Sequence, residues 1–333
     1  MRLFGGRERA TLTSEPTCWF ITTGEAGFRT QARGLAGAVF ARPREIVVGL
    51  AAPWDRLPAV WVPDPLSHLD PARAPLSPPW PDVLIGCGRG VAAISIGVRK
   101  ASGGATLTVQ IQDPLAPARR FDLVVAMSHD AIRGPNVVKV VTALHDITPA
   151  ALAEAADAWR SRMPRGEGPL AGVLLGGPTR GGRFAAGGEL VAALKGLRAG
   201  GTRLAILPSR RTPQALVGAL GEGFAADAGV LVWDRSGDNP YRGVLALADR
   251  LIVTSDSVSM VSEALATPHP VEVLGEAQNA RHRLFFRTLF DGGQLAPFAG
   301  GPPPVRAARP VSGTAEAAQA LRGLVSERTG WSA

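Results

Sequence analysis

The chain has few of the residues on which cross-links and metal centres are built. Only two cysteines, Cys18 and Cys87, occur among 333 residues, and they form no CxxC pair. There is no HExxH motif and no Asp-x-Asp pair of the kind that holds a metal-bound sugar nucleotide. These absences exclude a disulfide framework and the common zinc motifs, and they predict a reducing compartment and no metal site.

Long apolar runs and tyrosine are equally scarce. No segment reaches the length of a membrane span, and residues 1–16 lack the apolar core of a secretory signal. We therefore expect a soluble, cytoplasmic protein. The single tyrosine, Tyr241, has Leu245 four residues later, so the Tyr–Lys pair of short-chain reductases and epimerases is missing. NAD chemistry of that type is disfavoured.

The composition is that of a folded protein with a basic surface. Hydrophobic residues make up 46% and charged residues 19%, which allows a sizeable core. The net charge is +8, from 36 basic and 28 acidic residues. Such a surface suits acidic partners, such as nucleotide phosphates or anionic lipid headgroups. Nucleic acid is not expected, because no dense basic block with interleaved aromatic residues occurs.

Short apolar runs alternate with amphipathic stretches along both halves of the chain. This alternation predicts an α/β fold of two Rossmann-like domains with parallel sheets. We place the domains at residues 1–160 and 161–312, linked by residues 163–169, and a last helix at 313–333. The expected strands are residues 17–22, 45–49, 82–85, 106–111, 121–127, 170–175, 203–207, 230–233, 251–253 and 271–274.

Residues 248–274 carry the most informative pattern: a short apolar strand, a polar turn, a helix and a second strand. The free N–H groups at the start of that helix, with Ser257 and Ser259, can bind a phosphate. Glu263 lies about two turns into the helix, where its carboxylate can accept hydrogen bonds from a ribose. The alternative is that Asp256 and the serines only cap a structural helix.

Other expected strand ends in the second half are also polar or glycine-rich. Because the carboxyl ends of parallel strands meet at one edge of a sheet, we expect these residues to converge. Guanidinium groups suit bidentate phosphate recognition, so the set predicts a nucleoside diphosphate site, with solvated loops as the alternative. The residues concerned are Gly177, Ser209, Arg210, Arg211, Asp238 and Asn239.

A glycine-rich turn in the first half invites a dinucleotide interpretation. Gly86 and Gly88 follow an expected strand and open a helix, but the third glycine of G-x-G-x-x-G would fall at Val91. A phosphate or acceptor contact and a close approach of helix and strand remain equal explanations for the two glycines.

Two further strand ends in the first half carry groups that can exchange a proton. Asp113 follows one expected strand, and His129, beside Asp130, follows the next. His129 is the best candidate for a general base, although a lone histidine is more often structural.

Several blocks of sequence resemble the mitochondrial-fission ELM (elongated mitochondria) family. The resemblance runs from about residue 19 to about residue 298. It is carried by QIQDP (110–114), RFDLVVAMSHD (120–130), RGPNVV (133–138), LLGGPTR (174–180), PSRRTP (208–213), WDRSGDNPY (233–241) and TSDSVSMVSEALAT (254–267). Bacterial members are often labelled nucleoside-diphosphate-sugar epimerases, and plant members are implicated in recruiting a dynamin-like GTPase to mitochondria.

The resemblance implies the fold of GT-B glycosyltransferases, in which two Rossmann-like domains face a cleft and the last helix crosses back to the first domain. Residues 258–274 also resemble the donor segment of the transferase that adds N-acetylglucosamine in peptidoglycan synthesis. Ser257 to Met260 then match the diphosphate turn, and Glu263 matches the carboxylate that holds the ribose. The acceptor side would include Gly24, Glu25, Gly27, Gln31, Gly86 and Gly88, although Thr23 and Glu25 stand where the family commonly has Asp and Lys.

The sequence therefore predicts a metal-independent, GT-B-like glycosyltransferase that needs no cofactor beyond a nucleotide-sugar co-substrate. Arg210, Arg211, Ser257, Ser259 and Glu263 would bind the donor. The expected acceptor is lipid-linked or lies at a membrane surface, with the protein peripheral to the inner membrane. The alternative is a non-catalytic recruitment protein that retains the fold, and an NAD-dependent nucleoside-diphosphate-sugar epimerase ranks third. The sequence indicates neither the sugar nor the oligomeric state.

Overall fold

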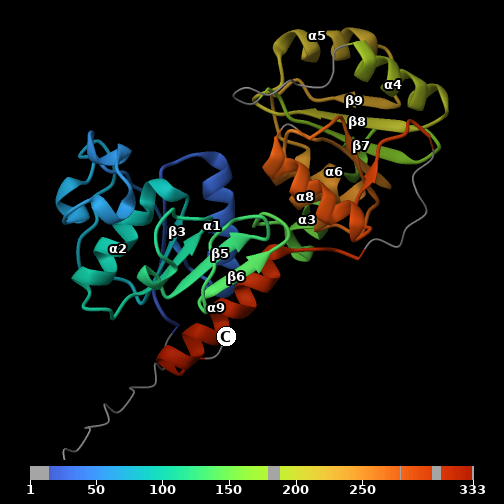
Figure 1. Ribbon diagram of the computed structural model, residues 1–333. Coiled ribbons are helices and arrows are strands. Elements are labelled where there is room, and N and C mark those ends of the chain that lie inside the picture. Colours follow the sequence, from blue (N-terminus) through green and yellow to red (C-terminus); the bar gives the residue numbers. More distant parts are fainter. Residues whose placement is uncertain (1–14, 179–187, 278, 302–308, 332–333) are drawn as a thin grey trace, which may run out of the picture. The chain divides into compact units, whose positions relative to one another are not determined.

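The computed structural model describes residues 15–178, 188–277, 279–301 and 309–331, and the chain divides into two compact units (Figure 1). Unit 1 comprises residues 1–146 and 313–333, and unit 2 comprises residues 147–312. The N-terminal residues 1–14 and the end of the LLGGPTR block, residues 179 and 180, lie outside the described residues.

Unit 1 is built on a parallel sheet of six strands whose order is β2-β1-β3-β4-β5-β6. Strands β3, β4 and β5 are buried along their whole length, as expected for a sheet covered on both faces. The order reverses direction between β1 and β3, which makes that edge the topological switch point. The elements are β1 (Cys18–Thr22), α1 (Ala26–Val39), β2 (Arg44–Val47), β3 (Val83–Cys87), α2 (Ala92–Ala101), β4 (Leu107–Ile111), β5 (Leu123–Met127), β6 (Val137–Val140) and α9 (Gly313–Thr329).

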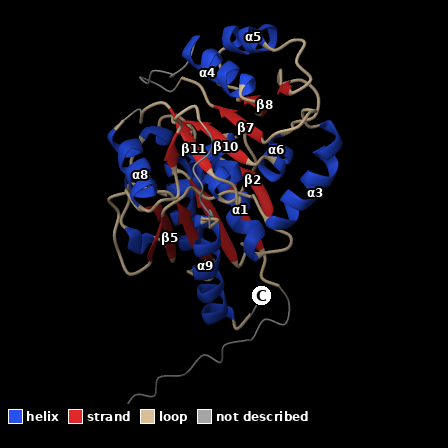
Figure 2. Ribbon diagram, turned by 90° about the vertical axis from the view of Figure 1, so that its right-hand side faces the viewer, coloured by secondary structure: helices blue, strands red, loops and turns tan. Residues whose placement is uncertain are grey.

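Unit 2 contains a second parallel six-stranded sheet, in the order β12-β11-β10-β7-β8-β9, with its switch point between β7 and β10. Helices (blue in Figure 2) cover the strands (red) of each sheet. The elements are α3 (Pro149–Trp159), β7 (Leu170–Leu175), α4 (Gly188–Ala199), β8 (Arg203–Pro208), α5 (Gln214–Gly223), β9 (Val230–Val232), α6 (Tyr241–Leu247), β10 (Arg250–Thr254), α7 (Val258–Leu265), β11 (Val271–Leu274), α8 (Ala280–Asp291) and β12 (Ala296–Pro297).

The units meet in the chain at residue 146/147, so the boundary that we placed at 160/161 and the link at 163–169 are wrong. Helix α3 belongs to unit 2 because it packs on α6. Gly243 of α6 lies so close to Trp159 of α3 that an added Cβ would be 2.5 Å from the Trp159 Cβ. The sequence predicts the helix but does not say which neighbour it packs against.

The last helix, α9, belongs to unit 1 and packs along α1 and β6 (red in Figure 1). Thr314 fixes its start, because its hydroxyl accepts from His145 N at 2.8 Å and donates to His145 O at 3.0 Å. Ala317, Leu321 and Val325 recur at helical spacing and are fully buried, which gives the helix its apolar face.

Candidate functional site

The loops that follow β7, β8 and β10 meet at the switch point of unit 2. Asp256, after β10, is buried, and its Oδ2 accepts from Gly177 N at 2.8 Å and from Arg211 Nη2 at 3.2 Å. Gly176 N donates to Thr254 Oγ1 at 2.8 Å. One carboxylate therefore ties together three strand ends that are far apart in the sequence.

The two glycines after β7 are required by close packing. A Cβ on Gly176 would lie 2.0 Å from Asp256 Oδ2, and a Cβ on Gly177 would lie 2.1 Å from the carbonyl oxygen of Arg211. Neither neighbour is the loose end of a long side chain. The double glycine is therefore part of the support of Asp256 and Arg211.

The loop after β8 is held rigidly, with its guanidinium groups at the surface. Thr212 Oγ1 accepts from Ser209 N at 2.8 Å and donates to Leu175 O at 3.0 Å. Arg235, after β9, donates to the carbonyl oxygens of Ser209 and Thr212 at 3.4 and 3.3 Å. Ser209 thus shapes the loop, whereas Arg210 is exposed and forms no ion pair within the described residues.

Helix α7 begins at the same edge. The Ser257 hydroxyl caps it by accepting from Met260 N at 3.4 Å. The N–H groups of Val258 and Ser259 have no partner within the helix, and they lie at the positive end of its dipole. This first turn has the properties of an anion-binding helix terminus.

Glu263 is half-buried one further turn along α7 and accepts a short hydrogen bond from the hydroxyl of Tyr241. Asp238 and Asn239, which we expected at the phosphate site, make other contacts in this structure. Asn239 Oδ1 accepts from Tyr241 N at 3.0 Å at the start of α6, and the exposed Asp238 pairs with Arg162 at 3.0 Å. The segment after β9 therefore provides Tyr241, whose hydroxyl contacts the Glu263 carboxylate.

His282, which its sequence context did not single out, also belongs to this cluster. His282 lies in the first turn of α8, where Asn279 Oδ1 accepts from His282 N at 2.9 Å. Burial and the neighbouring Arg281 lower the pKa of His282; Arg211 acts in the same direction and Asp256 opposes them. The available signal was the Asn-Ala-Arg-His sequence at residues 279–282, a few residues after β11, because Asn is a preferred N-cap.

Unit 1 has a cavity of about 1060 Å³ at its own switch point. It is lined by residues from the loops after β1, β2, β3 and β4, among them Glu25, Arg73, Arg89 and Leu115. Arg73 Nη1 donates to Thr23 O at 2.7 Å, and the Thr23 hydroxyl donates to the Glu25 carboxylate. This cavity can hold a small polar ligand with an apolar part.

Most of the other acceptor-side residues have structural contacts. Gly24 occupies a left-handed conformation with φ of 101°, and Gly27 lies in the exposed first turn of α1. A Cβ would lie 2.7 Å from Ser95 Oγ at Gly86 and 2.9 Å from the Phe28 ring at Gly88, which supports close packing there. Gln31 is buried and donates to Gly27 O at 3.2 Å.

The two predicted catalytic residues are not at the cavity wall. The side chain of His129 is only 5% exposed and lies 3.9 Å from the Asp130 carboxylate. The Asp113 carboxylate accepts from Leu115 N at 2.9 Å and so shapes the loop that lines the cavity. An acceptor hydroxyl could not contact His129 in this conformation, so the geometry gives no support for a general base there.

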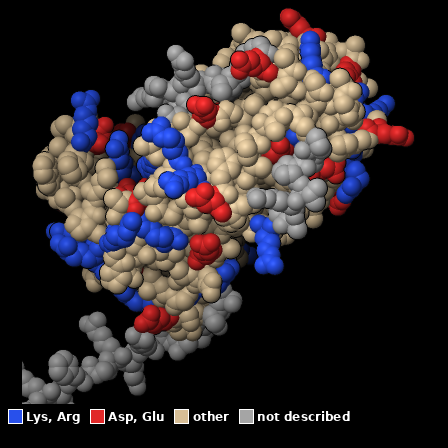
Figure 3. Space-filling view, turned by 45° about the vertical axis from the view of Figure 1, so that its right-hand side comes forward, with Lys and Arg blue, Asp and Glu red and all other residues tan. Residues whose placement is uncertain are grey.

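Within the described ranges, no three His, Cys, Asp or Glu side chains come together in a way that could hold a metal ion. Over the same ranges, no helix combines the length and apolar character that crossing a membrane requires. On the face drawn in Figure 3, basic side chains are spread widely, with acidic side chains among them.

Solved structures that share the fold of this chain include two epimerases. UDP-GlcNAc 2-epimerase from Methanocaldococcus jannaschii is 11% identical, with 93% of this chain and 99% of that one covered and a TM-score of 0.54. A putative UDP-N-acetylglucosamine 2-epimerase from Listeria monocytogenes is 12% identical, with 96% and 98% covered and a TM-score of 0.51. The predicted α/β fold of two Rossmann-like units, of GT-B type, is confirmed.

The sequence comparisons give the family. "Mitochondrial fission protein ELM1" of Arabidopsis thaliana is 31% identical over 281 residues, which cover 76% of this chain but only 65% of that relative. The family model described as "Mitochondrial fission ELM1" matches residues 26–324. The chain therefore belongs to the mitochondrial fission ELM1 family.

Proposed function

We propose that unit 2 binds a nucleotide-sugar and that the protein is a metal-independent, GT-B-like glycosyltransferase. The observation that carries the proposal is the convergence of Gly177, Arg211 and the start of α7 on Asp256 at the β7/β10 switch point. In open parallel sheets, ligands bind outside the carboxyl ends of the strands at that point.

The charges at this edge suit a diphosphate. Arg210 is exposed without an ion pair in the described part of the chain, and Arg211 is half-exposed, so both can turn towards an anion. The N–H groups of Val258 and Ser259 add the positive end of a helix dipole. Asp256 is negative, but Arg211 offsets its charge at 3.2 Å. These groups would stabilise a leaving diphosphate.

Glu263 would hold the ribose of the donor. It lies past the phosphate turn on the same helix, and its hydrogen bond to Tyr241 fixes one carboxylate oxygen. The two epimerase structures cited above are named as enzymes of a UDP-sugar, and this fold analogy supports the class of ligand.

The acceptor would bind in the cavity of unit 1. Glu25 is exposed and lines its wall, so this carboxylate is a better placed base than the buried His129. A lipid-linked or membrane-surface acceptor remains our proposal for the second substrate.

Recruitment without catalysis is the second candidate. Arg211 and Glu263 already have protein partners, as expected if the site had become structural. The Arabidopsis relative is named as a fission protein. This alternative predicts that no nucleotide-sugar binds at the β7/β10 edge.

Thermal unfolding with a panel of UDP-, GDP-, ADP- and CMP-sugars tests the proposal. Ligand at a hundredfold excess over Kd should stabilise the protein by about 2.7 kcal/mol, and we expect this for one nucleotide base. Glu263→Gln should lose most of the shift, whereas Glu222→Gln, an exposed position on α5, should keep it. A panel that gives no shift would favour recruitment.

Binding should also strengthen at lower pH. Burial, Arg281 and Arg211 hold the pKa of His282 below its ordinary value in the free protein, and Asp256 only partly opposes them. A bound diphosphate favours the imidazolium form and raises that pKa, so the complex binds a proton that the free protein does not. We expect the affinity for the nucleotide-sugar to rise about threefold to tenfold between pH 8 and pH 6.

Calorimetric titration of the nucleotide-sugar at both pH values measures this change. Equal affinities at both pH values, or an unchanged pH dependence in His282→Gln, would contradict the assignment of His282.

A further inference from the structure

Large apolar side chains are exposed on one part of unit 1. Among the described residues, five such side chains are exposed, and four of them are Leu57, Val60, Trp61 and Leu115, which we call the apolar rim. Trp61 is 71% exposed and Leu115 64%. Single exposed apolar residues are ordinary, but four on neighbouring turns indicate a contact surface.

The rim is continuous across two segments of the chain. Leu57 and Leu115 line the same 1060 Å³ cavity, from the loops after β2 and β4. Val60 and Trp61 belong to the 3-10 turn η2 (Ala59–Trp61), and Ala59 packs in one buried cluster with Ala118 of the neighbouring turn η5 (Ala118–Arg120). The rim therefore borders the mouth of the cavity.

The segment that carries the rim is anchored to the unit. Ala59 and Val62 are buried on either side of the exposed Val60 and Trp61. Trp54 stacks on His68, with ring centroids 4.1 Å apart, and closes the base of the segment. Buried residues thus flank the two exposed ones, so the fold of unit 1 itself keeps Val60 and Trp61 at the surface.

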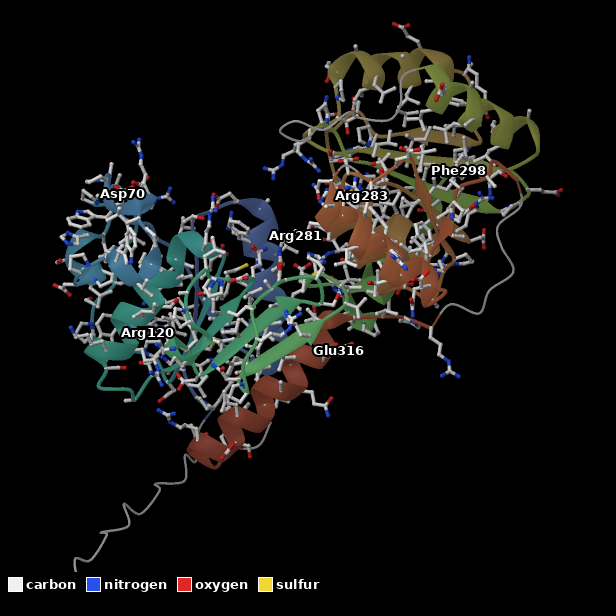
Figure 4. All side chains as sticks on the ribbon, viewed as in Figure 1. Asp70, Arg120, Arg281, Arg283, Phe298 and Glu316 are labelled. Atoms are coloured by element: carbon white, nitrogen blue, oxygen red, sulfur yellow. The ribbon has the colours of Figure 1, made fainter. Side chains whose placement is uncertain are left out.

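Basic side chains lie on the segments that carry or adjoin the rim. The exposed arginines Arg56, Arg89, Arg119 and Arg120 outnumber the exposed carboxylates at the rim and the cavity wall, which are Glu25, Asp55 and Asp64. Asp70 is neutralised by Arg73 at 3.4 Å (Figure 4 labels Asp70 and Arg120). The surplus is positive, as is the whole chain with its net charge of +8.

We propose that the apolar rim inserts into the headgroup region of an anionic bilayer, with the neighbouring arginines on the lipid phosphates. Tryptophan and leucine on a short segment flanked by cations are typical of interfacial membrane contacts. No membrane-crossing helix is needed for this mode of binding. The bilayer surface then lies against the mouth of the unit 1 cavity, so a ligand that reaches it can be drawn from the membrane. The proposal does not depend on the nucleotide-sugar site, which belongs to unit 2.

Vesicle flotation tests the proposal with the full chain and no nucleotide. The vesicles are phosphatidylcholine alone or phosphatidylcholine mixed with phosphatidylglycerol. We expect binding to the mixed vesicles, with a loss of at least about tenfold in affinity when Leu57→Ser and Trp61→Ser are combined. Leu284→Ser is the matched control, because Leu284 is 49% exposed on α8 in unit 2. It should bind like the wild type.

Substitution of the neighbouring arginines distinguishes binding to anionic lipid from nonspecific hydrophobic adsorption. Arg119→Gln and Arg120→Gln should each weaken binding to the anionic vesicles by about fivefold and leave the melting temperature unchanged. Failure of the wild type to float with anionic vesicles would overturn the proposal, as would equal binding of the rim variant. Concentration-dependent dimers that require Trp61, without vesicle binding, would assign the rim to a second copy of the chain instead.

Discussion

The substitution Gly176→Ala should weaken nucleotide-sugar binding by about a hundredfold. The added Cβ would lie 2.0 Å from Asp256 Oδ2, so the carboxylate or the end of β7 must move. Asp256 also holds Gly177 and Arg211. Because a displacement of about 1 Å in a positioned group can lower a reaction rate about a hundredfold, we expect a loss of similar size in the affinity for the nucleotide-sugar. Overpacking should lower the free energy of unfolding by about 1–3 kcal/mol. Calorimetric titration and chemical denaturation of the same variant measure the two effects.

Gly196→Ala is the matched control for this prediction. Gly196 lies inside α4, and an added Cβ would meet no atom within 4 Å. The substitution should raise the free energy of unfolding by about 0.5–1 kcal/mol and leave binding unchanged. If Gly176→Ala bound the nucleotide-sugar as tightly as Gly196→Ala does, the diphosphate would not lie at the end of β7.

Loss of the Glu272 carboxylate should be the most damaging single change to the stability of unit 2. Arg250 and Glu272 lie on adjacent strands, their side chains are 1% and 3% exposed, and Arg250 Nη2 is 2.7 Å from Glu272 Oε2. Glu272→Ala leaves a buried guanidinium without its counter-charge, which costs about 3–5 kcal/mol. Urea denaturation of the wild type and the variant measures this loss, as a lower transition midpoint at an unchanged m-value.

The double variant Arg250→Met with Glu272→Leu separates charge from packing. Apolar residues of similar size often replace a buried ion pair with little loss, so most of the stability should return. Arg250 also donates to Gly301 O at 2.8 Å, which sets a limit on that recovery. Glu222→Ala, exposed on α5, should change the free energy of unfolding by less than about 0.5 kcal/mol. A loss from Glu272→Ala no larger than this control would show that the ion pair contributes nothing.

The sequence predicts the parts of the site that depend on local pattern. The strand, polar turn and helix around Ser257 are visible because the apolar period changes at the turn. The meeting of Gly177 and Arg211 near that turn follows from a general property of parallel sheets. The helices α6 and α8 and the strands β6 and β12 were not predicted, because their apolar patterns are short or interrupted.

Side-chain partners could not be predicted, since they depend on strand order and packing. Nothing in the sequence says that Asp256 accepts from both Gly177 and Arg211, or that Tyr241 reaches Glu263. His129 looked catalytic because it follows a strand beside Asp130, but burial of its side chain is a tertiary property. His282 was passed over for the converse reason: its neighbours Asp256 and Arg211 come from distant loops.

Hydrogen exchange on the full chain, with and without the nucleotide-sugar that the thermal panel selects, tests whether the β7/β10 edge of unit 2 binds the donor. We expect slower exchange of the backbone amides at residues 174–178 and 255–260, because a diphosphate at the β7/β10 edge would contact or cover them. Unchanged exchange in both segments, under conditions in which the nucleotide-sugar is bound, would contradict this expectation. Protection confined to unit 1 would likewise place the ligand elsewhere and remove the basis for a donor site in unit 2.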